Sequence, residues 1–230
     1  MSRIKGGVIA AGHGTRFKDK GVETHKALLN VAGKPLLAWT LSQFVEAGVE
    51  DLTIVFNEYN APDCTHYLRE NFPNLNVDII VKTTASSFES FCEVSARIGP
   101  HPRLITAIDS IYRRGKLREL LQAAENRPPG AMVLGVTSFI DDEKPLYVEL
   151  GPDRSILSLG RGKSGWVTSG AYWMPPLALP SPEKFSALRR YLISAIENGT
   201  PAYAFDMGKS VDVDHPSDIQ TAETFLADIA

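Results

Sequence analysis

A short segment near the amino terminus has the residue types that bind a phosphate chain. After the apolar residues 8–11 come Gly12, His13, Gly14, Thr15 and Arg16, and Lys26 follows. Backbone N–H groups reach successive phosphates only where side chains leave room, and Gly12 and Gly14 provide that room directly after a strand. Thr15 adds a hydroxyl, and Arg16 adds a planar cation that pairs with two phosphate oxygens. The segment therefore predicts a nucleotide triphosphate site.

Two common phosphate-binding loops are excluded by the residues that follow. A dinucleotide-binding loop needs a third glycine at position 17, which is Phe17, and it continues into a helix where this chain has Lys-Asp-Lys-Gly at 18–21. A Walker loop needs Gly-Lys-Ser or Gly-Lys-Thr at a fixed spacing, and the chain lacks it. The segment is therefore interpreted neither as a loop that binds a nicotinamide dinucleotide nor as a Walker loop.

A longer pattern includes this segment. Gly-Val-Ile-Ala-Ala-Gly-His-Gly-Thr-Arg at 7–16, followed by Lys-Ala-Leu-Leu-Asn-Val-Ala-Gly-Lys-Pro-Leu at 26–36, resembles the signature of the nucleotidyltransferases that activate sugar phosphates and related phosphate esters. That family includes sugar-1-phosphate, choline-phosphate and molybdopterin nucleotidyltransferases. The resemblance implies that Arg16 and Lys26 are the catalytic cations. It implies a nucleotide-binding set of Ala10, Ala11, Gly12, His13, Gly14, Thr15, Arg16 and Lys26. We interpret Lys34 as an ordinary solvated cation.

Asp109 is the first candidate metal ligand. It ends the apolar run at 104–108, and ligands in open α/β sheets lie at the carboxyl ends of parallel strands. Nucleotidyl transfer gathers charge around the α-phosphorus and the leaving pyrophosphate, which Mg²⁺ held by carboxylates usually neutralises. The resemblance implies that Asp109 is the metal-binding aspartate of the central strand. The alternative is a turn or cap aspartate that leads into a helix after Ser110.

A second group of carboxylates comes late in the chain. Asp212 and Asp214 alternate along an extended segment, which places them on the same side. They match the first and third positions of a late aspartate motif in the resembled family, so both are candidate Mg²⁺ ligands, with Asp212 preferred. Asp214 has an alternative role as the N-cap of a helix that begins at Pro216. We interpret His215 as a turn residue.

Thr84, Ser86 and Ser87 follow a predicted strand and open a predicted helix. Their hydroxyls and the free N–H groups there suit hydrogen bonds to a nucleobase, ribose or phosphate. Their position resembles the family's base-recognition loop, so we expect them to bind nucleotide. The alternative is that a serine caps the helix with Glu89 or Ser90 nearby.

The acceptor side is predicted from a glycine inside a strand-like run. Gly170 suggests close approach by a ligand or by another backbone. Gly170 and Tyr172 fit the glycine-x-tyrosine of the family's acceptor-binding strand, and Arg161 or Lys163 is expected to meet the acceptor phosphate. The predicted acceptor-binding set is Lys163, Gly170 and Tyr172.

Composition limits the function classes. The 230 residues are 43% hydrophobic, which suits one substantial core, and the formal charge of −3 comes from interspersed acids and bases. We therefore expect no nucleic-acid partner. Cys64 and Cys92 lack metal or redox spacing, which favours reduced thiols. Without a signal-like or membrane-spanning apolar run, we expect a cytoplasmic protein with no membrane partner.

Strand-like runs alternate with helical patterns through most of the chain, which predicts a three-layer α/β/α, Rossmann-like mixed sheet in a single domain over 1–230. The expected strands are 4–11, 52–56, 77–81, 104–108, 131–136, 146–150, 156–159, 166–174 and 202–205. The expected helices are 35–47, 64–71, 88–98, 181–197 and 216 to the end. Strands without helices between them predict a small β-rich acceptor-side lobe at about 138–175.

These features together predict a Mg²⁺-dependent nucleotidyltransferase. Its partners are a nucleoside triphosphate and a phosphorylated small molecule, and it releases pyrophosphate. Two alternatives stay open. Asp212 and Asp214 form an aspartate-x-aspartate, as in glycosyltransferases that use nucleotide sugars, although that motif normally lies mid-chain. A nucleotide-binding module without catalysis is the other. The base, the acceptor and the oligomeric state are not predicted.

Overall fold

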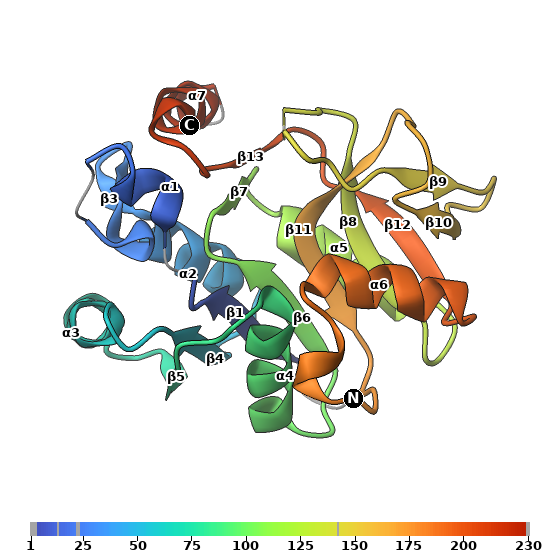
Figure 1. The fold of residues 1–230 in the computed structure, drawn as a ribbon, viewed down its shortest axis with the longest axis horizontal. Coiled ribbons are helices and arrows are strands. Elements are labelled where there is room, and N and C mark those ends of the chain that lie inside the picture. Colours follow the sequence, from blue (N-terminus) through green and yellow to red (C-terminus); the bar gives the residue numbers. More distant parts are fainter. Residues whose placement is uncertain (1–3, 13, 22–23, 142, 229–230) are drawn as a thin grey trace.

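One mixed sheet of seven strands forms the centre of the molecule in this computed structural model (Figure 1). The structure describes residues 4–12, 14–21, 24–141 and 143–228. The order across the sheet is β12-β8-β11-β6-β1-β4-β5. β11 pairs antiparallel with β6 and β8, and the other four pairs are parallel. The bounds are Lys5–Ala10 (β1), Asp51–Phe56 (β4), Asn76–Val81 (β5), Arg103–Ala107 (β6), Met132–Thr137 (β8), Val167–Met174 (β11) and Ala202–Asp206 (β12).

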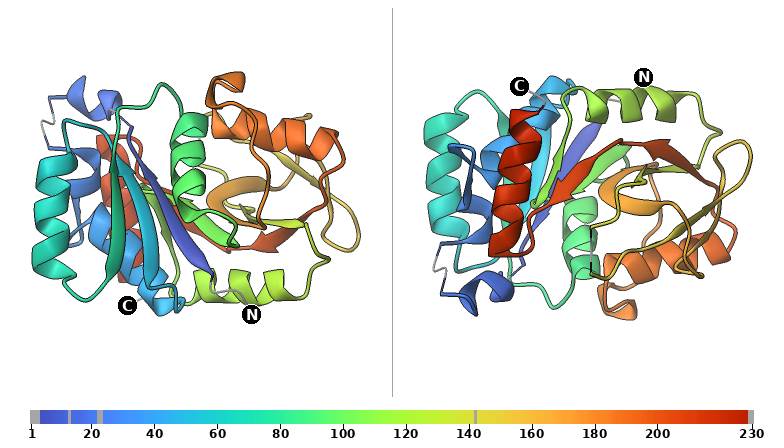
Figure 2. Two further views of the ribbon diagram at one scale, coloured as in Figure 1. Left: turned by 90° about the horizontal axis from the view of Figure 1, so that it is seen from below. Right: turned by 90° about the horizontal axis from the view of Figure 1, so that it is seen from above.

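Helices cover both faces of the sheet (Figure 2). One face carries α2 (Leu36–Glu46), α3 (Ala61–Asn71) and α5 (Lys116–Glu125). The other face carries α4 (Ser87–Ile98) and α6 (Leu188–Glu197). The expected three-layer α/β/α architecture with a mixed sheet is therefore confirmed.

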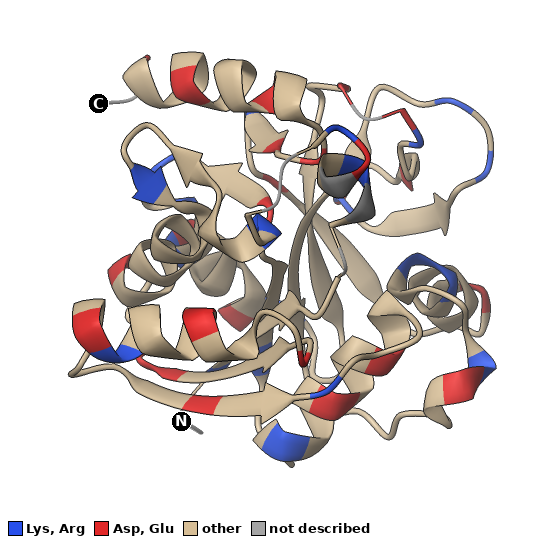
Figure 3. Cartoon of the chain, turned by 60° about the vertical axis from the view of Figure 1, so that its left-hand side comes forward, with Lys and Arg blue, Asp and Glu red and all other residues tan. Residues whose placement is uncertain are grey.

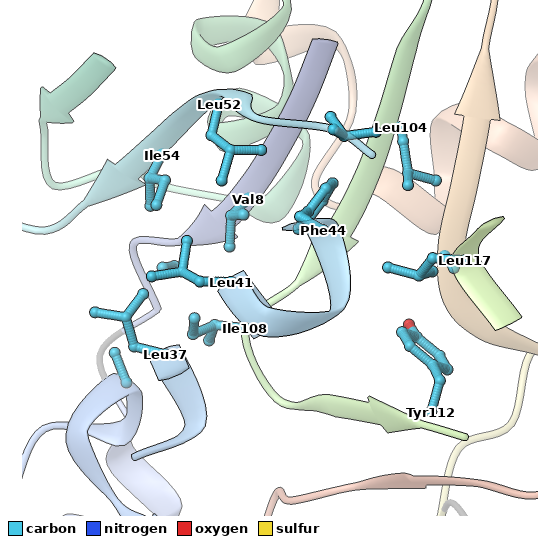
Figure 4. Packing of buried hydrophobic residues seen from close by; sticks show 14 of the residues in the cluster. Val8, Leu37, Leu41, Phe44, Leu52, Ile54, Leu104, Ile108, Tyr112 and Leu117 are labelled. Atoms are coloured by element: carbon cyan, nitrogen blue, oxygen red, sulfur yellow. The ribbon is translucent and has the colours of Figure 1, made fainter. Parts of the chain in front are cut away.

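Alternation along the strands divides the core into two layers. Neighbouring residues of a strand point to opposite faces, so Leu104 packs with the α2 side and Ile105 with the α4 side. Figure 4 shows Leu37, Leu41 and Phe44 packing around Val8. At Gly7 an added Cβ would lie 2.6 Å from Val94 Cγ1 of α4. The glycine therefore lets α4 pack closely on β1, the strand that leads into the predicted phosphate loop.

Short elements outside the main sheet complete the fold. β7 (Ser110–Tyr112) pairs antiparallel with β13 (Ser210–Asp212), which leads into α7 (Pro216–Ala227). The remaining elements are α1 (Thr15–Lys18), η1 (Lys26–Leu28), β2 (Asn30–Val31), β3 (Lys34–Pro35), β9 (Val148–Leu150), β10 (Ile156–Leu159) and η2 (Pro182–Lys184). A third apolar cluster, which includes Phe17, Leu29 and Phe225, joins α1 and α7.

The structure differs from the sequence expectations in three places. No bounds were predicted for α5, although Leu117, Leu121 and Ala124 have helical spacing and are buried. The helix expected over 181–197 begins at Leu188, because Pro182 opens a separate short 3-10 helix. Within the expected lobe at 138–175, β9 and β10 form their own two-stranded sheet, but β11 belongs to the central sheet.

Both cysteines are free and buried. Within the described ranges, no helix combines the length and the apolar composition needed to cross a bilayer.

Candidate active site

The glycine loop lies at the carboxyl end of β1 and borders a cavity of about 470 Å³. Ala10, Ala11, Gly12 and Gly14 line this cavity together with Arg16, Lys26 and Asp109. Gly14 has a φ of +62°, a conformation that glycine adopts without strain. His13 lies outside the described residues, and Thr15 begins α1. The loop and cations predicted from the sequence therefore meet at one cavity, which we call the loop cavity.

Asn57 is a supporting residue that the sequence analysis missed. It follows β4 and is buried, and its Nδ2 donates to Gly12 O at 3.0 Å. Its Oδ1 accepts from the backbone N–H of Asn60 at 3.0 Å. The side chain thus ties the glycine loop to the next parallel strand. Its place just beyond the carboxyl end of a strand was the available signal.

Lys26 lies between two carboxylates from distant parts of the chain. Its Nζ is 2.6 Å from Asp109 Oδ2 and 2.6 Å from Asp214 Oδ1. Burial lowers the pKa of Lys26, but the charges of Asp109 and Asp214 outweigh burial and raise it overall. The lysine is therefore a fixed positive charge in the loop cavity.

Arg16 pairs with the other oxygen of Asp214, at 2.9 Å from Oδ2. Burial raises the pKa of Asp214, but Lys26 and then Arg16 outweigh it and hold the pKa below its usual value. Phe17, the residue after Arg16, is almost fully buried in the third apolar cluster, together with Phe225 of α7. This packing anchors the segment that carries Arg16. The residue that excluded a dinucleotide loop thus has a packing role.

The alternative interpretation of Asp214 as the N-cap of α7 is wrong. The N-cap is His215, and Asp218 Oδ2 accepts from the backbone N–H groups of Asp214 at 2.9 Å and His215 at 2.7 Å. Because Asp218 satisfies the helix terminus, the Asp214 carboxylate is left to pair with Lys26 and Arg16.

Asp212 lies on β13 next to this cluster, and its Oδ1 accepts from Ser110 Oγ at 2.6 Å. The residue is exposed on one side, but protein surrounds its carboxylate closely enough that burial, followed by the charge of Asp109, raises its pKa to about 7. A carboxylate with this environment favours a nearby cation.

The three predicted metal ligands therefore gather at one place, but they do not form a complete protein cage. Among the described residues, no group of three or more His, Cys, Asp or Glu side chains has the arrangement needed to hold a metal ion. Mg²⁺ typically takes one or two carboxylates and fills its other positions with phosphate oxygens and water. Asp109 and Asp212 suit that smaller requirement by position. Ser110, the residue after Asp109, is the register partner of Asp212, and the Val213 N–H donates to Asp109 O at 3.0 Å, so the backbone holds the two aspartates close together.

The predicted base-recognition residues also border the loop cavity. Thr84 Oγ1 lies 2.7 Å from Ser90 Oγ, and Ser86 Oγ accepts from the Glu89 N–H at 3.0 Å as the N-cap of α4. Ser87 Oγ accepts from the Leu188 N–H at 3.0 Å. The capping role considered from the sequence is therefore present at Ser86, and these residues shape the cavity wall.

A second cavity of about 590 Å³ shares Arg16 and Asp214 with the loop cavity. Thr168, Ser169 and Asp212 also line it. The two cavities therefore meet at an ion pair.

Figure 3 shows acidic and basic segments interspersed over the side of the molecule that it presents.

The three predicted acceptor residues occupy different environments. Lys163 is exposed and lies outside the residues that border either cavity. Tyr172 packs against the α4-side core, where burial raises its pKa to about 12. Gly170 lies beside Ser110, not beside the cavity. Arg161, the other candidate cation, pairs with Glu197 at 2.7 Å.

Replacing Asp212 with asparagine is expected to change how stability depends on pH. Burial, followed by the charge of Asp109, raises the pKa of folded Asp212 to about 7, whereas an unfolded aspartate has an ordinary pKa of about 4. In that window the unfolded state binds fewer protons, so stability falls as pH rises. Asparagine keeps the acceptor for Ser110 but cannot ionise. In thermal melts in EDTA, the Tm of Asp212→Asn relative to the Tm of the unmodified chain should rise as the pH increases from 5 to 8.

Asp78→Asn is the matched control, because Asp78 is an exposed aspartate on β5. Its Tm should follow that of the unmodified chain across the same range. Parallel curves for Asp212→Asn and the unmodified chain would contradict the prediction.

Known proteins match this chain in sequence and in fold. The family model for the MobA-like NTP transferase domain matches residues 6–195. Choline-phosphate cytidylyltransferase of Haemophilus influenzae is 40% identical over 68 residues, which cover 30% of this chain and 25% of that protein. Glucose-1-phosphate thymidylyltransferase of Xanthomonas campestris pv. campestris is 26% identical over 137 residues, which cover 59% and 46%. The chain thus spans between a quarter and a half of the length of these curated relatives.

Solved structures share the fold over nearly the whole chain. The inositol-1-phosphate CTP transferase from T. maritima aligns with a TM-score of 0.80 at 18% identity, covering 100% of this chain and 99% of that one. A UDP-glucose pyrophosphorylase from Acinetobacter baumanii aligns with a TM-score of 0.77 at 16% identity, covering 96% and 92%. The chain belongs to the MobA-like NTP transferase domain family, and its matched relatives are nucleotidyltransferases.

Proposed function

We propose that the chain transfers a nucleotidyl group from a nucleoside triphosphate to the phosphate of a small molecule, with Mg²⁺ as cofactor and pyrophosphate as the second product. The observation that carries the proposal is the meeting of the two cavities at Arg16 and Asp214. A triphosphate along the glycine loop and an acceptor in the second cavity would both be next to this ion pair. Such a junction suits a reaction that joins two phosphorylated molecules.

The acceptor class is a sugar 1-phosphate or a phospho-alcohol. The named activities of the relatives support this range, from glucose-1-phosphate thymidylyltransferase to choline-phosphate cytidylyltransferase. The second cavity supports it too, because Thr168 and Asp212 line it with a hydroxyl and a carboxylate that can hydrogen-bond a small polar molecule.

In the proposed reaction an acceptor phosphate oxygen attacks the α-phosphorus of the triphosphate. The bond to pyrophosphate breaks, and the leaving group takes the electron pair. The attacking oxygen is already anionic at neutral pH, so no strong general base is needed, and positioning and charge stabilisation supply the catalysis. Lys26 and Arg16 bind and orient phosphate oxygens. Asp109 and Asp212, with Asp214 as a further candidate, would hold Mg²⁺, which supplies Lewis-acid stabilisation when bound.

The test offers each common nucleoside triphosphate with a panel of sugar 1-phosphates and phospho-alcohols and follows pyrophosphate, with Mg²⁺ and with EDTA. We expect Mg²⁺-dependent release for at least one pair. Triphosphate binding without release from any pair would instead identify a binding module. Transfer from a nucleotide sugar, measured with the same acceptors, would identify a glycosyltransferase.

A further inference from the structure

Ser110 holds one oxygen of the Asp212 carboxylate. The two residues are direct register partners between β7 and β13, and Ser110 Oγ donates to Asp212 Oδ1 at 2.6 Å. Ser110 is only 3% exposed, so water has little access to replace this hydroxyl. Among the hydrogen bonds of the described residues, Asp212 Oδ2 has no donor, which leaves that oxygen for a ligand in the second cavity, which Asp212 lines.

Gly170 provides the space that the Ser110 hydroxyl occupies. The register of β11 against β8 shifts between Thr168 and Tyr172, and Gly170 within this irregularity has a φ of +82°. A Cβ at position 170 would lie 2.6 Å from Ser110 Oγ, closer than real Cβ atoms approach an oxygen. Any larger residue would therefore push the hydroxyl away, and Ser110 would rotate off Asp212.

Tyr112 fixes the irregular part of β11 to the strand that carries Ser110. It is buried, and its hydroxyl donates to Ser169 O at 2.9 Å. Figure 4 shows its side chain extending from β7 toward the core. Because Ser110 and Tyr112 are alternate residues of β7, this bond keeps Gly170 in place beside Ser110.

We infer that Ser110 and Gly170 are positioning residues that orient the Asp212 carboxylate for a divalent cation. The inference rests on the proposed function, since the cation is the one that the reaction uses. Ser110 acts by fixing Oδ1, and Gly170 acts by leaving room for Ser110. Partners that orient a metal ligand typically contribute about 10- to 100-fold to metal affinity.

The test measures Mn²⁺ binding by the EPR signal of free Mn²⁺, which needs no turnover. Ser110→Ala should weaken binding about 10-fold, because Asp212 loses its orienting bond. Gly170→Ala should weaken it by a similar factor. In the double variant the two losses should not add, because the alanine at position 110 has no hydroxyl for the new Cβ to displace.

Gly130→Ala controls for backbone strain. Gly130 has the same φ of +82°, but an added Cβ there meets nothing within 4 Å. It should therefore bind Mn²⁺ as the unmodified chain does, while sharing the conformational cost of alanine at positive φ. Circular dichroism melts on all variants identify any that fail to fold. Ser110→Ala makes no new contact, so it keeps the inference testable if Gly170→Ala does not fold.

Unchanged Mn²⁺ affinity in Ser110→Ala would overturn the inference, as would full additivity in the double variant or the lack of Mn²⁺ binding by the unmodified chain. Pyrophosphate release by the unmodified chain is measured in parallel. If the unmodified chain releases pyrophosphate with Mg²⁺ but the variants bind Mn²⁺ with unchanged affinity, only the positioning role is contradicted. If the variants lose Mn²⁺ affinity as expected but no substrate pair gives pyrophosphate release, the positioning role is supported and the proposed function is contradicted.

Discussion

Lys26→Met is expected to lower kcat for pyrophosphate release by about 10²- to 10³-fold, the usual cost of removing one charge-stabilising donor from an active site. Methionine keeps most of the length of the side chain but has no charge. It therefore leaves Asp109 and Asp214 without the cation that lies 2.6 Å from each. Steady-state kinetics with the best substrate pair measures the effect.

Lys34→Met is the matched control. Lys34 belongs to the same predicted motif, but it is exposed and its Nζ lies 5.0 Å from the centre of the Trp39 ring, away from the carboxylates. Its kcat should stay within about twofold of the unmodified chain, because surface substitutions away from a site have small effects. Equal losses in both variants, or no loss in Lys26→Met, would contradict the assigned role of Lys26.

Asp109→Asn is expected to lower kcat by about 10²-fold or more, because a carboxylate that holds Mg²⁺ supports several kcal/mol of transition-state stabilisation. Asparagine is nearly isosteric, so the end of β6 and the turn into β7 should keep their structure. The Mg²⁺ concentration for half-maximal activity should rise together with the loss of kcat. Both follow from titrating Mg²⁺ at saturating substrates.

Asp78→Asn serves as its control, since Asp78 pairs with Arg97 on the surface and lines neither cavity. It should leave kcat and the Mg²⁺ requirement unchanged. If Asp109→Asn lowered kcat with an unchanged Mg²⁺ requirement, Asp109 would be a partner of Lys26 and not a metal ligand.

Much of the fold was predictable, because apolar periodicity is a local property of the chain. The strand at Lys5–Ala10 and the helix at Leu36–Glu46 were predicted within two residues. The same reasoning did not place β11 between β6 and β8, since Val167–Met174 has the composition of a strand in either a lobe or a sheet. Strand order depends on long-range pairing that no local pattern records.

The site shows the same division. Gly12, Gly14 and Arg16 predict phosphate binding because a loop that admits a phosphate chain needs those residue types within a few positions of one another. Asp109 was predicted as a metal ligand because the carboxyl end of a strand is a recurrent place for ligands. Asn57 was missed, since its role is to hold the carbonyl of Gly12, 45 residues away.

The amino-acid sequence alone predicted phosphate binding at the loop, the layered class of the fold and the candidate carboxylates. The folded chain decided which of these residues meet. Lys26 reaches Asp109 across 83 residues and Asp214 across 188. The tertiary structure also showed that Gly170, which was expected to bind the acceptor, makes room for Ser110. Spacing along the chain governs what a local segment can bind, whereas contacts between distant segments depend on how the sheet brings their ends together.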